Sequence, residues 1–359
     1  MSRRVRVLVA DDSRAIQQVF LTLLSSDPRL EVVGTAADGV EAVELARSLR
    51  PDVITMDVRM PRLDGLAATA AIMAEAPSRI LVVASVAEDQ QALVFRAMHA
   101  GALEVIQKPD VGSAGALASW GERLADSICL MSEVPVVTRR RSLALRAIPR
   151  RTQGRVDALG LVASTGGPPA LAEILGALPA DLPVPILVAQ HIASGFSQGL
   201  RRWLSEITPL RVELVKGPVP VRPGTVYLPQ DGLDLAVDPD GLGLVAGHPP
   251  SGTHRPSGNR LLSSIARAYR SRAGGVVLTG MGDDGAQGLL EIRRAGGAAF
   301  AQDEATCVVF GMPQAAHQLG AAEAMLPLPA IPAVIVELCA PGADLARRPS
   351  GLHQKKESV

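Results

Sequence analysis

Three positions in this 359-residue chain carry the residue types that acyl transfer needs, and each follows an apolar segment. Ser164 comes directly after Leu159–Ala163, His191 follows a second such segment, and the pair Asp283 and Asp284 follows a third. A serine nucleophile, a histidine base and an aspartate that orients the imidazole are the parts of a serine esterase. Taken alone, Ser164 is better explained as an N-cap serine at a strand-to-helix turn, and His191 alone is as readily structural as catalytic.

A second group of residues has the chemistry of a cation-binding, phosphate-accepting pocket. Asp11, Asp12, Asp57 and Lys108 all follow short apolar segments in the first third of the chain. Three carboxylates brought together repel one another unless a divalent cation lies among them, and ligands that are all oxygen suit Mg²⁺. A lysine at the same place can neutralise a phosphoryl group. Each residue alone is typical of a solvated loop, whereas the set indicates one pocket.

An alternation of strands and helices would bring each group together. Strands are predicted at 5–9, 32–33, 53–56, 80–83 and 105–106, with a helix at 40–49, and then at 159–163, 185–189 and 275–279. This alternation predicts an α/β fold with parallel sheets, in which the loops after the strands gather at one edge. The stretch from Gly217 to His248 breaks the pattern, with hairpin-like pieces around Tyr227 and Leu235, and is predicted to be a β insertion.

Composition excludes several other classes of protein. Hydrophobic residues make up 47% of the chain, which favours packed globular domains, and the length predicts two or three of them. Basic and acidic residues number 36 each, so no net charge favours nucleic acid or an anionic membrane. Three scattered cysteines indicate reduced thiols. No signal-peptide core follows Met1 and no apolar run is long enough for a bilayer, so we expect a cytoplasmic protein without membrane insertion.

Two familiar enzyme motifs do not fit the segment around Ser164. Val162 occupies the first glycine position of the G-x-S-x-G motif, and the order of serine, histidine and aspartate differs from that of α/β-hydrolases. No G-x-G-x-x-G follows Ala163, which argues against a dinucleotide-binding turn.

The first half of the chain resembles the receiver domain of two-component response regulators. The similarity rests on Asp11-Asp12, Asp57 followed by Met60-Pro61, Asp64-Gly65 and Lys108-Pro109. It implies a flavodoxin-like, doubly wound five-stranded parallel sheet over residues 1–130 and phosphorylation of Asp57. It also implies Mg²⁺ bound by Asp11, Asp12, Asp57 and the backbone carbonyl of Arg59, with Lys108 paired to the acyl phosphate. Ala84 occupies the position of the usual switch hydroxyl, and Ser85 follows it.

The second half resembles the catalytic domain of the CheB family, the chemotaxis protein-glutamate methylesterases. The matching segments are 163–168, Gln190-His191, 254–257, 278–285, 301–304 and 310–313. The resemblance implies a Rossmann-like α/β methylesterase domain with a β-hairpin insertion over residues 156–340. It implies Ser164 as nucleophile, His191 as base, Asp284 as orienting acid, amides of Thr165 and Met281 at the oxyanion, and no metal for ester hydrolysis. Val162, Ala193 and Asp234 depart from the family pattern.

Together these features predict a phosphorylation-regulated serine esterase that hydrolyses glutamate γ-methyl esters, and deamidates glutamines, on methyl-accepting chemoreceptors. The expected partners are the receptor cytoplasmic domain and a chemotaxis-type histidine kinase, and the expected state is a monomer. A basic, solvated linker is predicted over residues 131–155 and a flexible tail over 341–359. The alternative left open is a catalytically weak, phosphorylation-controlled receptor-binding protein in a non-motility pathway; a DNA-binding effector is disfavoured because the second half is long and strand-rich.

Overall fold

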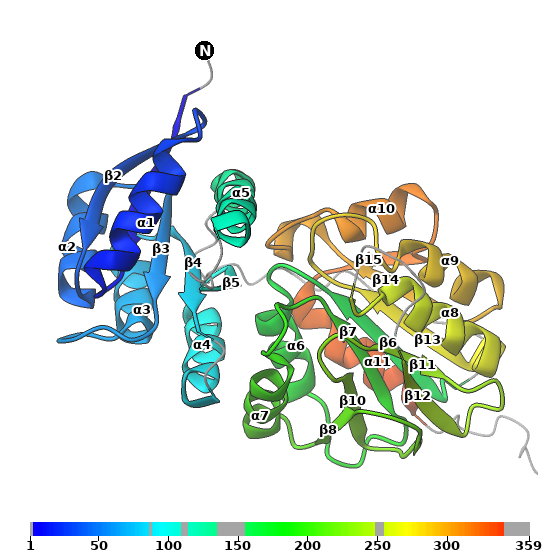
Figure 1. The fold of residues 1–359 in the computed structure, drawn as a ribbon. Helices are drawn as coiled ribbons and strands as arrows, with labels where there is room; N and C mark the ends of the chain where they lie inside the picture. Colours follow the sequence, from blue (N-terminus) through cyan, green and yellow to red (C-terminus); the bar gives the residue numbers. More distant parts are fainter. Residues whose placement is uncertain (1–2, 86–87, 109–113, 135–154, 248–254, 341–359) are drawn as a thin grey trace, which may run out of the picture.

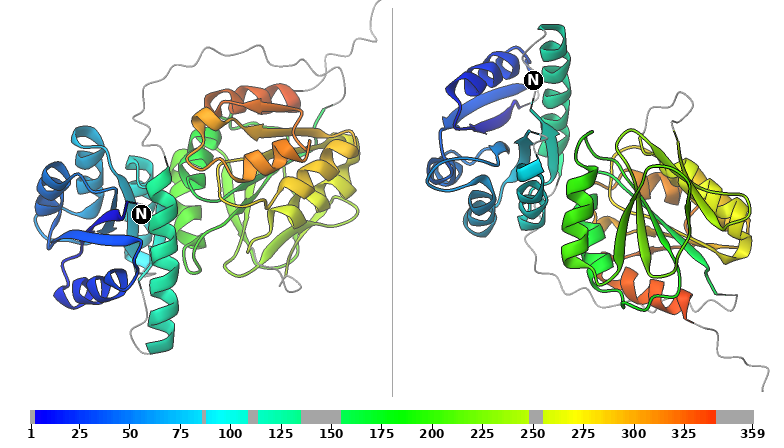
Figure 2. Two further views of the ribbon diagram at one scale, coloured as in Figure 1. Left: turned by 90° about the horizontal axis from the view of Figure 1, so that it is seen from above. Right: turned by 60° about the horizontal axis from the view of Figure 1, so that its bottom comes forward.

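The computed structural model describes residues 3–85, 88–108, 114–134, 155–247 and 255–340, which form two α/β domains (Figure 1). Most of the predicted linker, residues 135–154, and the predicted tail, 341–359, lie outside these ranges, as do Pro109 and His254. The two domains are separate layered units in all views (Figures 1 and 2).

The first domain has a five-stranded parallel sheet in the order β2-β1-β3-β4-β5, which confirms the doubly wound prediction. Its strands are β1 (Val5–Ala10), β2 (Leu30–Ala36), β3 (Val53–Asp57), β4 (Arg79–Ala84) and β5 (Glu104–Gln107). Its helices are α1 (Arg14–Ser25), α2 (Gly39–Leu49), α3 (Gly65–Glu75), α4 (Glu88–Ala100) and α5 (Ala114–Glu133). Helix α5 therefore continues past residue 130.

Successive residues of the central strands pack on opposite faces of this sheet. Leu8 and Ile54 lie in a core shared with α2, α3 and α4, whereas Val7 and Val53 pack with residues of α1 and α5. Strands buried on both faces are near-continuous apolar runs, which is why they could be recognised in the sequence.

The second domain has a seven-stranded parallel sheet in the order β15-β14-β13-β6-β7-β10-β8. The strands are β6 (Ala158–Ala163), β7 (Ile186–Gln190), β8 (Arg211–Val215), β10 (Thr225–Pro229), β13 (Ala273–Val277), β14 (Ala298–Gln302) and β15 (Ala324–Leu326). The helices are α6 (Gly167–Gly176), α7 (Ser197–Ile207), α8 (Gly258–Tyr269), α9 (Ala286–Arg294), α10 (Met312–Gln318) and α11 (Ile331–Cys339). The chain order reverses around β6, so the loop after β6 lies at the switch point of the sheet.

The predicted β insertion exists, but it is smaller than expected. Strands β11 (Asp234–Val237) and β12 (Gly243–Gly247) form an antiparallel hairpin, joined by the short strand β9 (Val219–Pro220). The piece around Tyr227 is not part of it, because β10 pairs in parallel with β7 and β8 of the main sheet. Every residue of β10 is buried, as befits an interior strand.

The domains meet where α4 of the first packs on α7 of the second (Figure 1). The rings of Phe95 and Trp203 stack with their centroids 5.6 Å apart, and His99 meets Trp203 edge-on at 6.0 Å. At the exposed rim, Arg96 donates to Glu206 over 3.3 Å. Among the described side chains the contact is therefore mainly apolar, with an exposed ion pair at its rim.

Candidate active site and receiver pocket

The three candidate catalytic residues lie at the carboxyl edge of three adjacent strands. Ser164 follows β6, His191 follows β7 and Asp284 lies in the loop after β13. Ser164 and His191 both line a cavity of about 890 Å³. The Nε2 atom of His191 lies 2.8 Å from Oδ2 of Asp284, whereas Asp283 is exposed. The structure thus brings the second aspartate of the pair to the histidine.

The carboxylate of Asp284 is held by the first turn of α8. Backbone N–H groups of Gly258, Asn259 and Gly285 donate to it over 2.6, 2.9 and 3.0 Å, and its side chain is 2% exposed. Burial would raise the pKa of Asp284, but the hydrogen bonds from His191 and from the two α8 amides outweigh it and lower the pKa. An aspartate held ionised at a helix N-terminus stays available to orient the imidazole.

Two backbone amides are available beside the nucleophile. Among the described residues, neither Thr165 N–H nor Met281 N–H donates a hydrogen bond. The loop that carries Met281 lies against Ser164, because a Cβ built on Gly280 would come within 2.6 Å of the Ser164 Cβ. Free amides next to a nucleophile can stabilise an oxyanion. The Met281 side chain itself is largely exposed.

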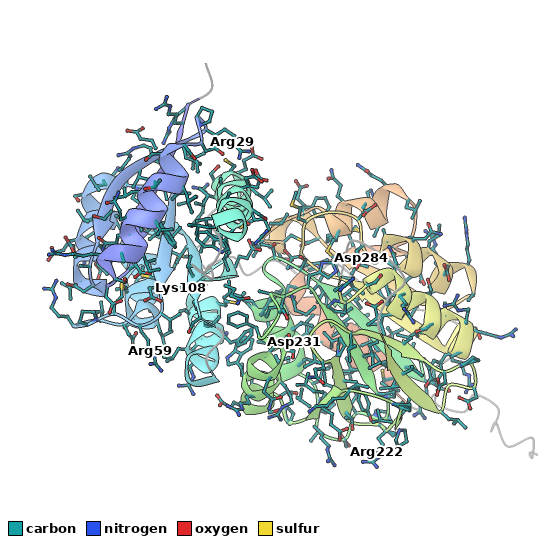
Figure 3. The ribbon with its side chains drawn as sticks, viewed as in Figure 1. Arg29, Arg59, Lys108, Arg222, Asp231 and Asp284 are labelled. Atoms are coloured by element: carbon teal, nitrogen blue, oxygen red, sulfur yellow. The ribbon has the colours of Figure 1, made fainter. Side chains whose placement is uncertain are left out.

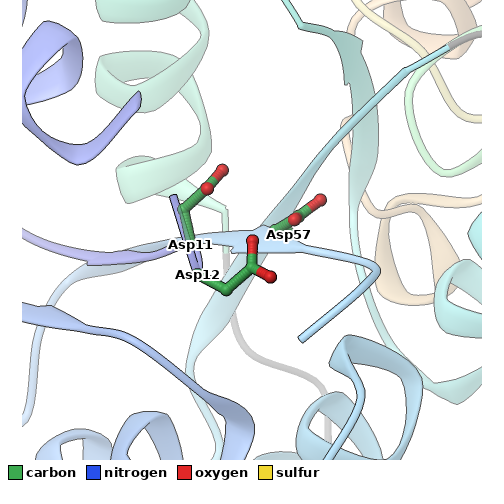
Figure 4. Close-up of side chains that lie close together, drawn as sticks. All are labelled: Asp11, Asp12 and Asp57. Carbon is green, nitrogen blue, oxygen red and sulfur yellow. The ribbon is translucent and has the colours of Figure 1, made fainter. Parts of the chain in front are cut away.

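The acidic group of the first domain forms one pocket (Figure 4). Carboxylate oxygens of Asp11, Asp12 and Asp57 lie within 4.8 Å of one another. The Lys108 ammonium lies 2.8 Å from Asp11 and 3.0 Å from Asp57. Burial raises the pKa of Asp57 even though Lys108 acts to lower it. Burial opposes the charge of Lys108, but Asp11 and Asp57 still raise its pKa.

This donor set fits Mg²⁺. Three clustered carboxylates supply oxygen ligands only, and one lysine neutralises only part of their charge. Arg59, whose carbonyl was predicted to complete the set, follows β3 at the same edge and its side chain is exposed (Figure 3).

Comparison with known proteins identifies both halves. The response regulator receiver domain model matches residues 7–113, and the CheB methylesterase model matches 159–335. A protein of Myxococcus xanthus (strain DK1622), named protein-glutamate methylesterase/protein-glutamine glutaminase 3, is 54% identical over 352 residues, 98% of each chain. The chain belongs to the CheB family of methylesterases. The predicted family, its receiver domain and its class of hydrolase are thereby confirmed.

Other CheB-family proteins are similar either to nearly the whole chain or to one of its two domains. A protein of the same name from Anaeromyxobacter dehalogenans (strain 2CP-C) is 44% identical over 90% of this chain and 95% of its own. The crystal structure of the Thermotoga maritima CheB methylesterase catalytic domain is 34% identical, covering 52% of this chain and all of that one, with a TM-score of 0.49. The response regulator domain of Thermotoga maritima CheB is 40% identical over 37% of this chain and 99% of that one, with a TM-score of 0.34.

Each departure from the CheB pattern has a defined place in the structure. Val162 packs against Gly258 and Gly285, where an added Cβ would come within 2.2 and 3.1 Å of its side chain. Asp234 is buried, accepts the backbone N–H of Ser257 over 2.8 Å and lies 3.4 Å from Arg260. The aspartate therefore braces the residue that caps α8, one residue before the turn that holds Asp284.

The remaining departures lie at the cavity and at the receiver pocket. Ala193 lines the cavity beside His191. Ala84 is fully buried at the end of β4, and its carbonyl accepts the Lys108 N–H over 2.8 Å. Ser85 follows it and is half-buried.

Two contributions to the CheB site escaped the sequence interpretation. The α8 amides that hold Asp284 follow Ser257, and a serine before an apolar-periodic segment is a helix-start signal that could have located them. The carboxamide of Gln190, which donates to the carbonyls of Ser164 and His191, had no such signal.

None of the helices in the described parts of the chain is long and apolar enough to cross a bilayer.

Proposed function

We propose that this CheB-family protein hydrolyses glutamate γ-methyl esters on chemoreceptors, and deamidates their glutamines, by acyl transfer through Ser164. The observation that carries the proposal is the 2.8 Å contact of His191 Nε2 with the buried Asp284, beside Ser164 in one cavity. The named activity of its relatives supports the substrate class. An intact serine, histidine and aspartate favour this function over a catalytically weak binding protein.

The contact with Asp284 supports one path for the proton. Because Nε2 donates to the carboxylate, Nδ1 is the nitrogen left without a proton, and it acts as the base. It takes the Ser164 hydroxyl proton as Oγ attacks the ester carbonyl, and the amides of Thr165 and Met281 stabilise the oxyanion. The imidazolium then protonates the leaving methanol, and water activated by the same nitrogen releases free glutamate. With glutamine, ammonia leaves instead.

The test is an assay of the purified protein with a methylated receptor cytoplasmic domain. Release of methanol in proportion to loss of receptor methyl groups is expected. A receptor that binds the protein but keeps its methyl groups would refute the proposal and favour the binding-protein alternative. Because the substrate is a receptor cytoplasmic domain, we propose that the protein acts in the cytoplasm with a chemotaxis-type kinase as phosphodonor.

We further propose that the receiver controls the esterase through Asp57. Asp11, Asp12, Asp57 and the Arg59 carbonyl would hold Mg²⁺, which supplies charge neutralisation for phosphoryl transfer. The Asp57 carboxylate is the acceptor, and Lys108 pairs with the product acyl phosphate. Receiver and catalytic residues line one cavity, so a change in the receiver can alter access to Ser164.

Replacing Asp57 with asparagine is expected to abolish labelling by a small acyl-phosphate donor, because the amide is not a nucleophile toward phosphorus. Removing Mg²⁺ should have the same effect on the wild-type chain. Covalent phosphate is measured by mass spectrometry of the intact protein. Asp64→Asn is the matched control, since Asp64 follows the same strand but serves as the N-cap of α3. Equal labelling of the Asp57→Asn protein would place the acceptor elsewhere.

Glu104 of β5 is expected to make closure of this cavity depend on pH. It lines the cavity with Ser164, and burial raises the pKa of its carboxyl from 4.5 to about 7. The stability of the closed arrangement is then fully present below about pH 4.5 and is lost as pH rises through about 7. We expect the unphosphorylated protein to expand as the pH rises from about 4.5 to about 7 in small-angle scattering, and Glu104→Gln to stay compact over the same range.

Other charged groups line the same cavity, namely Lys108, Arg123, His191 and Arg255. The Glu104→Gln comparison leaves all of them in place, and scattering reports domain separation without catalysis. Expansion that persists unchanged in Glu104→Gln would assign the pH dependence to one of these groups and refute the role of Glu104.

A further inference from the structure

The carboxamide of Gln190 ties together the backbones of the two residues proposed to react. Its Nε2 donates to the carbonyl oxygen of Ser164 over 2.9 Å and to that of His191 over 2.7 Å. Gln190 is the last residue of β7 and only 3% exposed. One side chain therefore contacts the main chain of both the nucleophile and the base.

The Gln190 side chain bonds to Ser164 and His191 just beyond the last residue pair of the β6–β7 ladder, so these two residues do not form a pair in that ladder. The register of β6 and β7 ends at the pair Ala163 and Gln190, and His191 N–H makes the final backbone bond to the Ala163 carbonyl over 2.9 Å. Beyond that pair the β6 chain turns into α6 and the β7 chain turns into a loop. The Gln190 amide continues the cross-strand connection for one further residue on each side.

The opposite end of the same amide is packed against the nucleophile turn. Gln190 Oε1 is buried and accepts no hydrogen bond from any described residue. A Cβ built on Gly167 would lie 2.1 Å from it. The two donated bonds and this close packing leave the carboxamide one orientation, because the reversed amide would turn an oxygen toward two carbonyls.

We infer that Gln190 is a positioning residue that sets the separation of Ser164 and His191 for attack on the ester. This inference rests on the proposed chemistry of those two residues. Reacting groups must be held within fractions of an ångström, and a shift of about 1 Å costs on the order of 100-fold in rate. Gln190→Met keeps the length and volume of the side chain but removes both donated bonds.

The experiment is timed labelling of Ser164 in the full-length protein with a fluorophosphonate, whose phosphorus bonds to Oγ as fluoride leaves. Gln190→Met is expected to be labelled about 10- to 100-fold more slowly than wild type, yet to the same final extent. Gly167→Ala, which displaces the carboxamide from its other side, should be slowed in the same way. A purely structural role would instead lower the labelled fraction and leave the rate of the folded protein unchanged.

Gln17→Met is the matched control. Gln17 also donates from Nε2 to two carbonyls, those of Asp11 and Ala36, but in the receiver. Its labelling rate should equal that of wild type. Wild-type rates in Gln190→Met at full labelling would overturn the positioning role alone. Absence of any Ser164-dependent labelling in the wild-type protein, judged against Ser164→Ala, would refute the proposed function on which the inference rests.

Discussion

Ser164→Ala is expected to reduce methanol release from a methylated receptor by at least about 10⁴-fold while leaving the fold intact. Thr165 follows Ser164 and also lines the cavity, but its proposed contribution is its backbone N–H, so the acyl-enzyme has no substitute nucleophile. The measurement is initial methanol release under saturating receptor, with thermal unfolding as the check on folding. Methanol release near the wild-type rate would end the acyl-enzyme mechanism.

The adjacent aspartates provide a matched comparison for the rest of the triad. Asp284→Asn should leave only trace activity, because the amide carries no charge to stabilise the imidazolium and keeps only one oxygen acceptor. Its NH2 group must therefore face N–H donors on one side, either those of His191 and Gly258 or those of Asn259 and Gly285. Asp283→Asn alters an exposed side chain and should retain most activity. A larger loss in Asp283→Asn than in Asp284→Asn would mean that the assignment within the pair is wrong.

A chain that begins at Val156 is expected to be more active than the unphosphorylated full-length protein, because the receiver no longer lines the cavity of Ser164. If 1% of full-length molecules are open, the gain is about 100-fold, and moving them to 99% open requires about 5.5 kcal/mol of differential stabilisation. Phosphorylation should raise activity by less than deletion does, since Ala84 lacks the hydroxyl that receivers place there. Ala84→Thr should widen the response.

Substitutions at the contact between the two domains provide a second test, in the full-length protein, of whether the receiver occludes the active site. Trp203→Ala removes the stack on Phe95 and should raise the unphosphorylated activity. Arg96→Ala alters the same helix contact but removes only an exposed ion pair, so it should change activity little.

The truncated chain that begins at Val156 provides the decisive comparison. If it were slower than the unphosphorylated full-length protein, the receiver would assist catalysis and the occlusion model would be refuted.

The residues at the carboxyl edges of the two sheets could be predicted because buried parallel strands appear in the sequence as short apolar runs. Asp57, Ser164, His191 and Asp284 each follow a buried apolar run, and parallel topology brings the ends of such runs together. The structure places them at those edges. Tyr227 was misassigned because β10 and β11 are separated by only a short turn, which resembles a hairpin in the sequence, although β10 pairs elsewhere.

Other parts of the site depend on contacts between distant segments. The α8 amides reach Asp284 at a place where Gly258 and Gly285 both pack closely against Val162. In the sequence, Gln190 is an ordinary residue at the end of a strand. Its contacts with Ser164 and His191 depend on the fold, which brings the turn after β6 beside it. The stacking of Phe95 on Trp203 joins two domains, and neither residue has a periodicity or motif that pairs it with the other.

The apolar contact between α4 and α7 also limits what else can bind the receiver. Phe95 is fully buried there, so a protein that recognises this face of α4 must displace the catalytic domain from it. This competition is reciprocal. The catalytic domain, when packed on α4, weakens the binding of such a protein by a certain free energy, and that protein, when bound, favours the open esterase by the same free energy. A docking partner of α4 would therefore act as an activator without transferring phosphate.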